Sequence, residues 1–426
     1  MRVVAPTKVL QVELARPLAP AATPADERTR YPLAFVLVRL HGEPLGTVTL
    51  KLRNGEVDAA ALTAQIRRDL GPRISEHLKQ DGATGDVRFK QDGSLDAPGR
   101  CRGERLRHAW PLASVIVSTR DRPRELEVCI ESLLRMTHPH FEVIVVDSAP
   151  STSATRDAVE RYTGGRVTVR YVREEQPGLA RARNRGVTAA AGDLVAFTDD
   201  DVCVDTSWLN ELTWAFDVTS GAVCTTGLSL PAELETPSQV WFEEFGGFSM
   251  GFERRIFDLD SHRGVEPLYP YKVGWFGSGL NMAFDATSLR ALGGFDEHLG
   301  AGTRVHGGED LDVFLRVILQ GWRLVYEPRA LVWHYHRREL RALRRQLHGS
   351  GAGLSAVLVK RLRDPSTRRD VLAKAWPGLR YLLAPSSPKN LGKTPGFPRS
   401  LTVAELAGVA AGPFMYSYSV WRDGQP

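Results

Sequence analysis

Four short apolar segments between residues 114 and 197 set the main constraint on how this chain can fold. Residues 114–118 and 141–146 are continuous runs rich in β-branched side chains, which is typical of parallel strands buried on both faces. Residues 167–172 form a more alternating strand, and residues 194–197 form the fourth. Apolar residues at helical spacing lie between these segments. This β-α-β-α succession predicts an α/β domain built on an open, largely parallel sheet.

Acidic side chains follow three of these strands at the point where each strand stops. Asp121 comes shortly after the first strand, Asp147 directly after the second, and Asp199, Asp200 and Asp201 follow the fourth. Open parallel sheets bind their ligands at the carboxyl ends of the strands. We therefore expect these five carboxylates, which are far apart in the sequence, to converge on one crevice.

The three consecutive aspartates at 199–201, here called the acidic triplet, carry the strongest chemical signal. Carboxylates this close repel one another, so a cation is the natural way to neutralise them. Oxygen ligands suit Mg²⁺ or Mn²⁺, and a hard cation held by a few carboxylates keeps positions open for substrate phosphates. Acidic residues after a strand also fit a solvated turn, and the triplet alone does not decide between the two interpretations.

The amino-acid composition of the chain is typical of an ordinary globular protein. The chain has 426 residues, of which 42% are hydrophobic and 25% charged, and it is long enough for two domains. Its cysteines (Cys101, Cys129, Cys203 and Cys224) lack metal-ligand spacing and are too few for a secreted disulfide scaffold, so we interpret them as reduced thiols of a cytoplasmic protein. We find no signal-peptide pattern and no apolar run of the ~18 residues that a membrane span needs.

The chain is predicted to have three parts. Residues 1–105 form an N-terminal accessory α+β domain with a linker at 81–103, residues 106–345 the α/β domain, and residues 346–426 a helical and irregular C-terminal extension. Within that extension, residues 401–421 fit a packed helix and an irregular tail.

The N-terminal part shows no catalytic pattern. Strands are predicted at 9–14, 33–40 and 47–52, followed by a helix at 58–80 that is interrupted at Gly71-Pro72. Scaffolding, oligomer contact and acceptor docking all remain open as roles for this part.

An ordered set of motifs resembles the family 2 glycosyltransferases of the non-processive bacterial type, which have the GT-A fold. The resemblance covers roughly residues 112–345 and implies a Rossmann-like mixed sheet flanked by helices. It also implies an inverting transfer of a sugar from a nucleoside-diphosphate sugar to an acceptor hydroxyl or other nucleophile. The motifs are Ser114-Val115-Ile116-Val117-Ser118-Thr119-Arg120, Val145-Val146-Asp147, Ala182-Arg183-Asn184-Arg185-Gly186, the acidic triplet, Gly277-Ser278-Gly279-Leu280-Asn281-Met282-Ala283-Phe284, Gly293-Gly294-Phe295-Asp296-Glu297, Gly307-Gly308-Glu309-Asp310-Leu311-Asp312, Tyr326-Glu327-Pro328 and Val332-Trp333-His334.

The resemblance assigns a set of residues to the sugar-nucleotide donor. A carboxylate there would accept hydrogen bonds from the base or the ribose hydroxyls, and a guanidinium would fit the diphosphate oxygens. Simpler roles compete with these: helix capping for Asp121 and Asp147, and a surface position for Arg183. The implied donor-binding residues are Thr119, Arg120, Asp121, Asp147, Arg183, Asn184, Asp199 and Asp200.

A divalent metal, Mn²⁺ or Mg²⁺, is the implied cofactor, bridging the two phosphates of the donor. Asp201 is our first choice as a direct ligand, Asp199 is the second, and His334 is the candidate third ligand. His336 has the same side-chain parity on an extended strand and competes with His334. A pair of solvent-facing histidines is the alternative to both.

The resemblance places the chemistry at Asp310, which would take the acceptor proton as general base, with Glu309 supporting the site. Both begin a helix, where acids are also favoured by the helix dipole alone. The flanking Gly307-Gly308 would let the acceptor approach closely. The acceptor-binding segment is Trp275, Gly277, Ser278 and Gly279.

Nearby aromatic residues fit either an acceptor platform or core packing. These residues are Trp241, Phe242, Phe245, Phe248, Tyr269, Tyr271, Trp275 and Phe276.

The region after residue 336 is rich in arginine, and an apolar helical face there comprises Leu340, Leu343, Leu347, Leu354, Val357 and Leu358. This fits peripheral contact with the inner face of an anionic membrane, or an arginine-rich surface covering the α/β domain.

The acceptor remains open between glycan, lipid-linked, peptide and small-molecule compounds. We expect no nucleic-acid partner, and oligomer formation also stays open. A nucleotidyltransferase and a non-catalytic sugar-nucleotide-binding protein are the competing functions.

Overall fold

The computed structural model describes residues 3–18, 30–82, 89–90, 92–95 and 111–423. The chain forms two compact units. Unit 1 comprises residues 1–108 and 231–240, and unit 2 comprises residues 109–230 and 241–426. Most of the predicted linker at 81–103, together with Cys101 and the predicted boundary at residue 105, lies outside the described residues.

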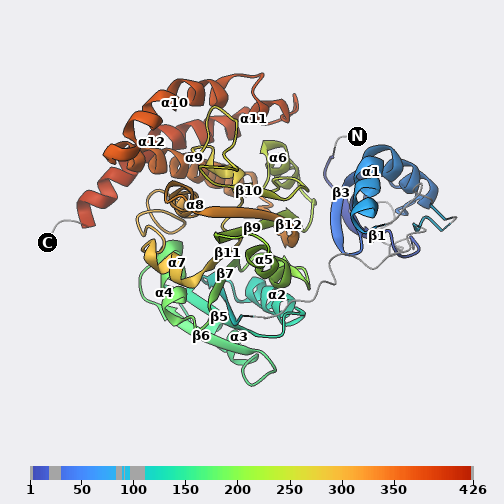
Figure 1. Ribbon diagram of the computed structural model, residues 1–426, viewed down its shortest axis with the longest axis horizontal. Coiled ribbons are helices and arrows are strands. Elements are labelled where there is room, and N and C mark those ends of the chain that lie inside the picture. The colour runs from blue at the N-terminus through green and yellow to red at the C-terminus, as the bar shows by residue number, and fades with distance from the viewer. Residues whose placement is uncertain (1–2, 19–29, 83–88, 91, 96–110, 424–426) are drawn as a thin grey trace. The chain divides into compact units, whose positions relative to one another are not determined.

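Unit 1 is a small α+β unit, as predicted. β1 pairs parallel with β2, and β2 pairs antiparallel with β3. The third strand begins at Glu43 rather than at Thr47, because the connection to the second strand is a tight turn. The elements are β1 (Thr7–Glu13), β2 (Leu33–Leu40), β3 (Glu43–Lys51) and α1 (Ala59–Gln80) (Figure 1).

Helix α1 is continuous, so the predicted interruption at Gly71-Pro72 is wrong. Asp58 caps its first turn by accepting a hydrogen bond from the Ala61 N–H. Leu70 and Ile74, on either side of the dipeptide, are both buried in the core of unit 1. This packing keeps the helix continuous although Pro72 has no backbone N–H to donate to the residue one turn earlier.

Unit 2 is built on a mixed sheet in the order β10-β12-β9-β11-β7-β4-β5-β6, with β8 paired to β12. Strands β4 to β7 are the four predicted strands, and they are parallel to one another. β11 joins β7 in the antiparallel sense and makes the sheet mixed. The bounds are β4 (Ala113–Thr119), β5 (Phe141–Ser148), β6 (Thr168–Glu174), β7 (Leu194–Asp199), β8 (Val202–Val204), β9 (Ala222–Pro231), β10 (Arg255–Phe257), β11 (Asn281–Asp285) and β12 (Arg323–His334).

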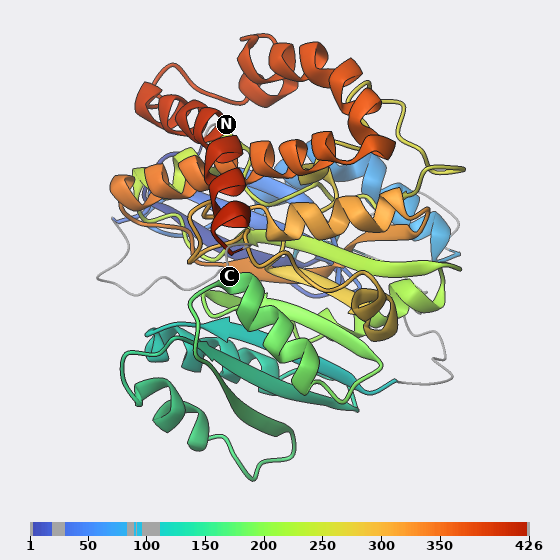
Figure 2. The ribbon, with the colours of Figure 1, turned by 90° about the vertical axis from the view of Figure 1, so that its left-hand side faces the viewer.

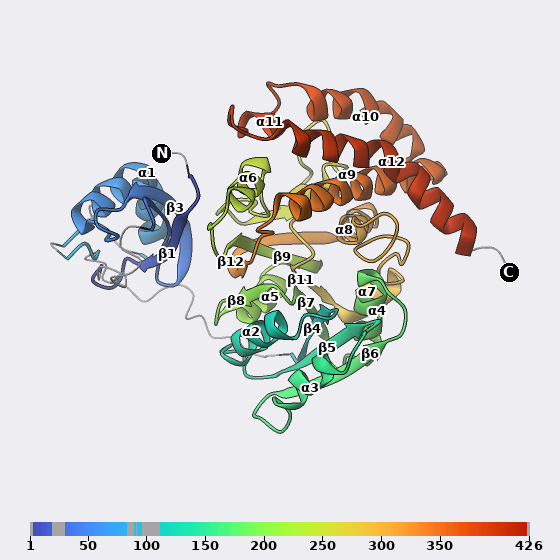
Figure 3. The ribbon, with the colours of Figure 1, turned by 180° about the vertical axis from the view of Figure 1, so that it is seen from behind.

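Two apolar cores bury both faces of the parallel strands. Val115 and Val117 join the core that includes α2 and α3, whereas Ile116 joins the core that includes α4. The arrangement of the helices around the sheet can be followed in Figures 2 and 3. The bounds are α2 (Pro123–Leu134), α3 (Ala154–Glu160), α4 (Leu179–Ala189), α5 (Trp208–Asp217), α6 (Pro237–Phe245), η3 (Val273–Trp275), α7 (Ala286–Ala291), α8 (Glu309–Leu319), α9 (Leu340–Arg363), α10 (Pro365–Leu383), α11 (Pro388–Leu391) and α12 (Arg399–Asp423). The predicted mixed sheet flanked by helices is confirmed.

The C-terminal part of unit 2 is helical, as predicted, and α9 packs against α8, α10 and α12 (Figure 1). Helices α9 and α12 meet backbone to backbone. A Cβ atom at Gly408 would overlap the His348 carbonyl oxygen, and one at Gly412 would overlap the Ala352 carbonyl oxygen. Glycine is therefore required at both positions for this close approach.

The irregular tail predicted within residues 401–421 is wrong, because α12 runs without a break from Arg399 to Asp423. Gly412 and Tyr416 are buried on either side of Pro413, so packing holds the helix together across the proline. In the part of the chain that the structure describes, no helix combines the length and apolar character needed to cross a membrane.

We predict that Gly408→Ala lowers the free energy of unfolding by about 1–3 kcal/mol, because the new methyl group would collide with the backbone of α9. Equilibrium urea unfolding measures the change. The matched control is Gly378→Ala in α10, where the nearest atom to a new Cβ lies 3.9 Å away. The control should be neutral or stabilising by up to about 1 kcal/mol, because alanine is the better helix former. Equal effects of the two substitutions would contradict this account of the α9–α12 contact.

Candidate active site

The register of the parallel strands brings the predicted donor residues to one edge of the sheet. Thr119 of β4 is paired with Asp147 of β5, and the residue before Thr119 is paired with Asp199 of β7. Thr119 Oγ1 donates a 2.7 Å hydrogen bond to Asp200 Oδ2. Asp200 and Asp201 line a pocket of about 300 Å³ at this edge. The structure therefore brings these predicted residues together at the carboxyl ends of the strands.

Three arginines neutralise the acidic triplet. Arg183 Nη2 lies 3.2 Å from Asp199 Oδ1. Arg122 Nη1 lies 2.5 Å from a carboxylate oxygen of the second aspartate and 3.1 Å from one of the third, which also lies 3.0 Å from Arg337 Nη1. The second and third aspartates are only 5% and 4% exposed. This burial and pairing exclude a simple solvated turn.

The two buried aspartates of the triplet differ in their affinity for protons. Burial and the neighbouring charge of Asp201 raise the pKa of Asp200 to about 7, although Arg122 opposes the shift. Burial alone would also raise the pKa of Asp201, but His334, Arg337 and Arg122 hold it well below its usual range. Asp201 is therefore the carboxylate of this pair that stays ionised, as a metal ligand must.

His334, at the end of β12, faces Asp201, with 3.4 Å between His334 Nε2 and Asp201 Oδ1. On its other side, His334 Nδ1 lies 2.7 Å from His336 Nδ1, and His336 Nε2 lies 2.8 Å from Glu243 Oε1. Because the Glu243 carboxylate only accepts hydrogen bonds, His336 Nε2 must carry a proton. Burial lowers the pKa of His336, so its ring is neutral and its Nδ1 accepts a hydrogen bond from His334 Nδ1–H. This arrangement puts a proton on His334 Nδ1, so Nε2, the nitrogen that faces Asp201, is the atom that a metal ion would bind in place of a proton.

Asp201 and His334 fit a divalent cation. Ligands bind Mg²⁺ at about 2.0–2.1 Å in octahedral geometry, so two adjacent ligands of one ion stand roughly 3 Å apart. The 3.4 Å between His334 Nε2 and Asp201 Oδ1 is close to this spacing. His336, the competing histidine, lies behind His334 and orients it, as partners of metal-bound histidines commonly do. Asp199 pairs with Arg183 instead, and the three predicted ligands do not lie within reach of one ion among the described residues.

Arg183 connects the acidic triplet with the second acidic motif. Its side chain is 2% exposed, which excludes the surface position considered for it. Nη1 lies 2.9 Å from Glu309 Oε1, and Nη2 donates a 2.9 Å hydrogen bond to the Gly279 carbonyl oxygen as well as pairing with Asp199. Burial and the charge of Asp310 raise the pKa of Glu309 to about 7 against the effect of Arg183.

Asp310 is the more accessible acid of the second motif: it is half-buried, whereas Glu309 is buried. Its Oδ2 accepts a 2.9 Å hydrogen bond from the Gly279 N–H, and its Oδ1 accepts a 2.8 Å hydrogen bond from the Leu311 N–H. A Cβ atom at position 279 would lie 2.9 Å from Asp310 Cβ and 3.0 Å from Arg183 Nη1. Glycine is therefore required where this backbone meets both side chains.

Gly307 and Gly308 face α9, which corrects the expectation that they make room for the acceptor. A Cβ atom at Gly308 would lie 2.8 Å from Gly353 Cα, and one at Gly307 would lie 2.8 Å from the Gly349 carbonyl oxygen. The φ of Gly308 is +92°, which also favours glycine. These glycines fix the start of α8 against α9.

The other residues predicted at the donor side occupy different environments. Arg120 is exposed, and Asp121, also exposed, accepts hydrogen bonds from the backbone N–H and the hydroxyl of Ser151. Asp147 is fully buried and accepts a 3.1 Å hydrogen bond from the Tyr171 hydroxyl. Its second oxygen meets no well-aligned donor among the described residues. Burial raises the pKa of Asp147.

The side chain of Asn184 bonds to the 293–297 loop and holds it in place. Its Oδ1 accepts from the Phe295 N–H at 2.8 Å, and its Nδ2 donates to the Phe295 carbonyl oxygen at 2.9 Å and to Glu297 Oε1 at 3.1 Å. These contacts occupy both ends of the side-chain amide, so the structure shows Asn184 as a support of the 293–297 loop.

The predicted acceptor segment lies beside Asp310. Trp275 is half-buried, and the Lys272 ammonium lies 3.2 Å from its ring centre. Gly277 packs against the Thr226 side chain, and Ser278 is buried. Of the aromatic residues considered as an acceptor platform, four belong to apolar cores and are buried: Phe242, Tyr269, Tyr271 and Phe276.

Three residues of the site were missed in the sequence. Arg122 immediately precedes Pro123 at the start of α2, and its position in the sequence indicates only that it lies at the end of a helix. Arg337 belongs to the arginine-rich region, and nothing in its spacing points back to Asp201. Glu243 lies within the aromatic segment and has no motif around it.

Comparisons with known proteins agree with this geometry. Residues 114–260 match the model of the family described as glycosyl transferase family 2. The pre-mycofactocin glycosyltransferase of Mycobacterium tuberculosis is 28% identical over 299 residues, which is 69% of this chain and 56% of the relative. The putative teichuronic acid biosynthesis glycosyltransferase TuaG of Bacillus subtilis is 37% identical over 129 residues, 30% of this chain and 50% of the relative. The chain thus spans about half the length of these curated relatives.

Among solved structures, a mannosyltransferase of Pyrobaculum calidifontis in complex with GDP-Man and Mn²⁺ aligns with a TM-score of 0.47 and 20% identity, covering 86% of this chain and 90% of the other. The TarS protein of S. aureus, residues 1–349, aligns with a TM-score of 0.44 and 15% identity, covering 74% and 92%. The matched segment begins with β4 and includes the acidic triplet, and the mixed sheet with its flanking helices is the arrangement predicted from the sequence. Residues 114–260 thus match glycosyltransferase family 2.

Proposed function

We propose that this protein is an inverting glycosyltransferase that moves a sugar from a nucleoside-diphosphate sugar to an acceptor nucleophile, most simply a hydroxyl. One observation carries the proposal: the buried guanidinium of Arg183 pairs with both Asp199 and Glu309. It thereby holds the acidic triplet beside helix α8, whose second residue is Asp310. A donor bound at the triplet would present its reacting carbon to the half-buried Asp310 carboxylate.

The donor half of the site has two arginines suited to a diphosphate. The side chains of Arg122 and Arg337 are 31% and 41% exposed and reach the triplet from the solvent side. Their guanidinium groups can pair with phosphate oxygens in place of the aspartates. Both terminal nitrogens of the buried Arg183 side chain contact protein acceptors, so we assign it to positioning rather than to direct phosphate contact.

Asp201 and His334 would hold the divalent cation, Mn²⁺ or Mg²⁺, and Asp199 would join them if its carboxylate turned away from Arg183. When bound, such a cation stabilises negative charge on the departing diphosphate. His336 and Glu243 hold His334 in the tautomer that a metal ligand needs.

Asp310 is the proposed general base. Its carboxylate takes the proton of the acceptor hydroxyl while that oxygen forms a bond to the anomeric carbon of the sugar. The bond from this carbon to the diphosphate breaks on the opposite face, and its electron pair leaves with the nucleoside diphosphate. The configuration at the anomeric carbon therefore inverts.

The two competing functions predict different products. A nucleotidyltransferase would release pyrophosphate rather than nucleoside diphosphate. A non-catalytic sugar-nucleotide-binding protein would release neither of these compounds. Asp310, open to an acceptor and fixed by the Gly279 and Leu311 backbone, favours the transferase.

We also infer that helix α10 contacts an anionic membrane surface, which favours a lipid-linked acceptor. The apolar face of α9 predicted for this role is unsuited, because Leu343, Leu347 and Val357 are buried within unit 2. Helix α10 provides a different face. Its exposed apolar residues recur at helical spacing and are flanked by exposed arginines, a combination typical of interfacial helices. The apolar residues are Leu372, Trp376, Leu379 and Leu383, and the arginines are Arg368, Arg369 and Arg380.

Asp310→Asn is expected to lower turnover by about 10²–10⁴-fold and to leave donor affinity unchanged, because it removes the proton acceptor alone. A thermal-shift screen of nucleotide sugars with Mn²⁺ identifies the donor, and product analysis then measures release of nucleoside diphosphate. Asp193→Asn, an exposed aspartate at the amino end of β7, is the control and should keep full turnover. Unchanged turnover in Asp310→Asn would refute the base assignment, and pyrophosphate as product would refute the glycosyltransferase.

Metal dependence is tested at His334. Mn²⁺ should strengthen donor binding in the unaltered protein, and His334→Gln should abolish this gain. His336→Gln should weaken Mn²⁺ binding by about 10–100-fold, because it removes the group that orients the ligand. Calorimetry with and without a chelator measures both effects, and His140→Gln, at the amino end of β5, is the control. Donor binding and turnover that persist unchanged in the chelator would rule out the metal.

Membrane contact is tested with Trp376→Glu, whose side chain is 73% exposed on α10. The unaltered protein should sediment with vesicles containing phosphatidylserine, and the substitution should reduce the bound fraction strongly because it buries a charge in the interface. Val218→Glu, an exposed position at the end of α5, should bind like the unaltered protein. Equal binding to neutral and anionic vesicles, or no loss with Trp376→Glu, would contradict this assignment.

A further inference from the structure

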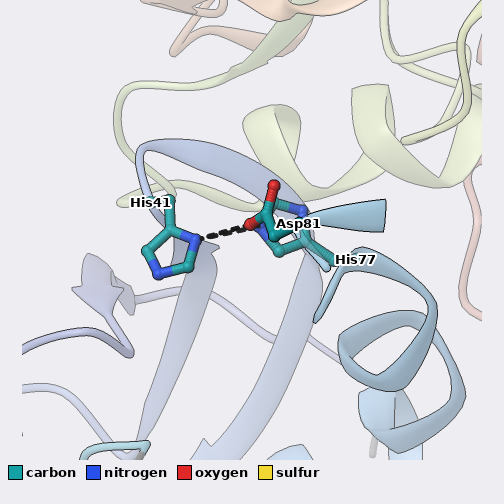
Figure 4. Close-up of side chains that lie close together, drawn as sticks. All are labelled: His41, His77 and Asp81. Carbon is teal, nitrogen blue, oxygen red and sulfur yellow. Dashed lines mark hydrogen bonds and ion pairs between the residues drawn. The ribbon is translucent and has the colours of Figure 1, made fainter. Parts of the chain in front are cut away.

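Unit 1 contains a buried cluster of His41, His77 and Asp81 that the proposed function does not use (Figure 4). The side chains of His77 and Asp81 are 5% and 3% exposed, and that of His41 is 10% exposed. Three atoms that can each act as a metal ligand lie close together there: His41 Nδ1, His77 Nε2 and Asp81 Oδ2. The separations are 2.9 Å from His41 to Asp81, 3.1 Å from His77 to Asp81 and 3.2 Å between the two histidines.

These three atoms form a nearly equilateral triangle of the size that one metal ion requires. Zn²⁺ binds histidine nitrogen and carboxylate oxygen at about 2.0–2.2 Å, so neighbouring ligand atoms around it stand roughly 3 Å apart. An ion above the triangle therefore contacts all three atoms without movement of the backbone.

Hydrogen bonding alone satisfies this triangle poorly. Asp81 accepts hydrogen bonds but donates none while it is ionised. If both histidines donated to Asp81 Oδ2, their two N–H groups would stand side by side at an N···N distance of 3.2 Å. A metal ion instead uses the lone pairs of both nitrogens and the charge of the carboxylate together.

The fold fixes the three side chains from two separate elements. His41 and Gly42 form the turn between β2 and β3, with φ of +53° and +80°, as in a two-residue hairpin turn. The Glu13 carboxylate accepts hydrogen bonds from the backbone N–H groups of both turn residues, at 3.0 Å and 2.8 Å. His77 and Asp81 lie one turn apart at the end of α1, so they share one side of the helix.

Glu43 completes the surroundings of the cluster. Its Oε2 lies 3.6 Å from His77 Nδ1, the ring nitrogen that points away from the triangle. Metal-bound histidines usually present their second nitrogen to a carboxylate in this way. The carboxylates of Glu43, Asp81 and Glu13 all act electrostatically on His77, so the pocket favours a positive ion.

We propose that unit 1 binds a divalent transition-metal ion, Zn²⁺ in the first instance, through His41 Nδ1, His77 Nε2 and Asp81 Oδ2. Water completes the coordination. The ion ties the β2–β3 turn to the end of α1 and so stabilises unit 1. This site does not depend on the glycosyltransferase function, and failure of either proposal leaves the other intact.

The test titrates the full-length protein with ZnCl₂ after removal of metal with a chelator. Asp201→Asn serves as the background, because it removes the cation ligand proposed in unit 2. Calorimetry should show one equivalent of bound Zn²⁺. Asp81→Asn, which keeps the shape of the side chain, should weaken binding by more than about 100-fold, and Glu43→Gln by about 10–100-fold. His262→Gln is the matched control: His262 Nδ1 lies 2.9 Å from Asp258 Oδ2, but the pair belongs to no three-ligand group among the described residues.

Circular dichroism checks that each variant is folded. If Asp81→Asn does not fold, Glu43→Gln still tests the site. The visible spectrum of the Co²⁺-loaded background protein should report nitrogen and oxygen ligation and should be lost with Asp81→Asn. Absence of Zn²⁺ binding in the background protein would overturn the proposal. Equal Zn²⁺ affinity of the background protein and both unit 1 variants would overturn it as well.

Discussion

The ion pairs of Arg183 are the interaction on which the arrangement of unit 2 depends. Its guanidinium lies between Asp199, the last residue of β7, and Glu309, the first residue of α8. A single buried cation therefore joins the end of the parallel sheet to the helix that presents Asp310. Removing one member of such a buried pair usually costs about 3–5 kcal/mol, because its partner keeps an uncompensated charge. Gly279 belongs to the same constraint, because its backbone contacts both Arg183 and Asp310.

The parallel half of the sheet was predictable because its signals are local. Continuous β-branched runs define the strands, and the position of the acidic triplet after β7 follows directly from strand order. The sequence also showed that Asp310 begins a helix, since apolar spacing follows it. Such signals need no knowledge of distant contacts. The continuity of α1 through Pro72 and of α12 through Pro413 was not predictable, because tertiary packing outweighs the local propensity at both prolines.

The parts of the site that residue spacing alone could not predict arise from contacts between segments far apart in the sequence. His334 reaches Asp201 because β12 pairs with β8, which places His334 opposite Val202. Arg337 approaches the triplet as the chain leaves that same strand. No spacing rule links these positions. The same limit applies to unit 1, where the relation between two side chains one helical turn apart is visible in the sequence but their proximity to a hairpin turn is not.

Because the arginines around the triplet differ in exposure, their charge interactions should differ in their dependence on ionic strength. Arg122 and Arg337 are partly in solvent, where dissolved ions screen charges over a Debye length of about 8 Å at physiological salt. Arg183 is sealed from solvent. Salt would therefore weaken the attraction between these two arginines and the diphosphate of the proposed donor, while the ion pairs of Arg183 that join the sheet to α8 would keep their strength. The charges proposed to attract the donor are thus distinct from the charges that hold the fold of unit 2 together.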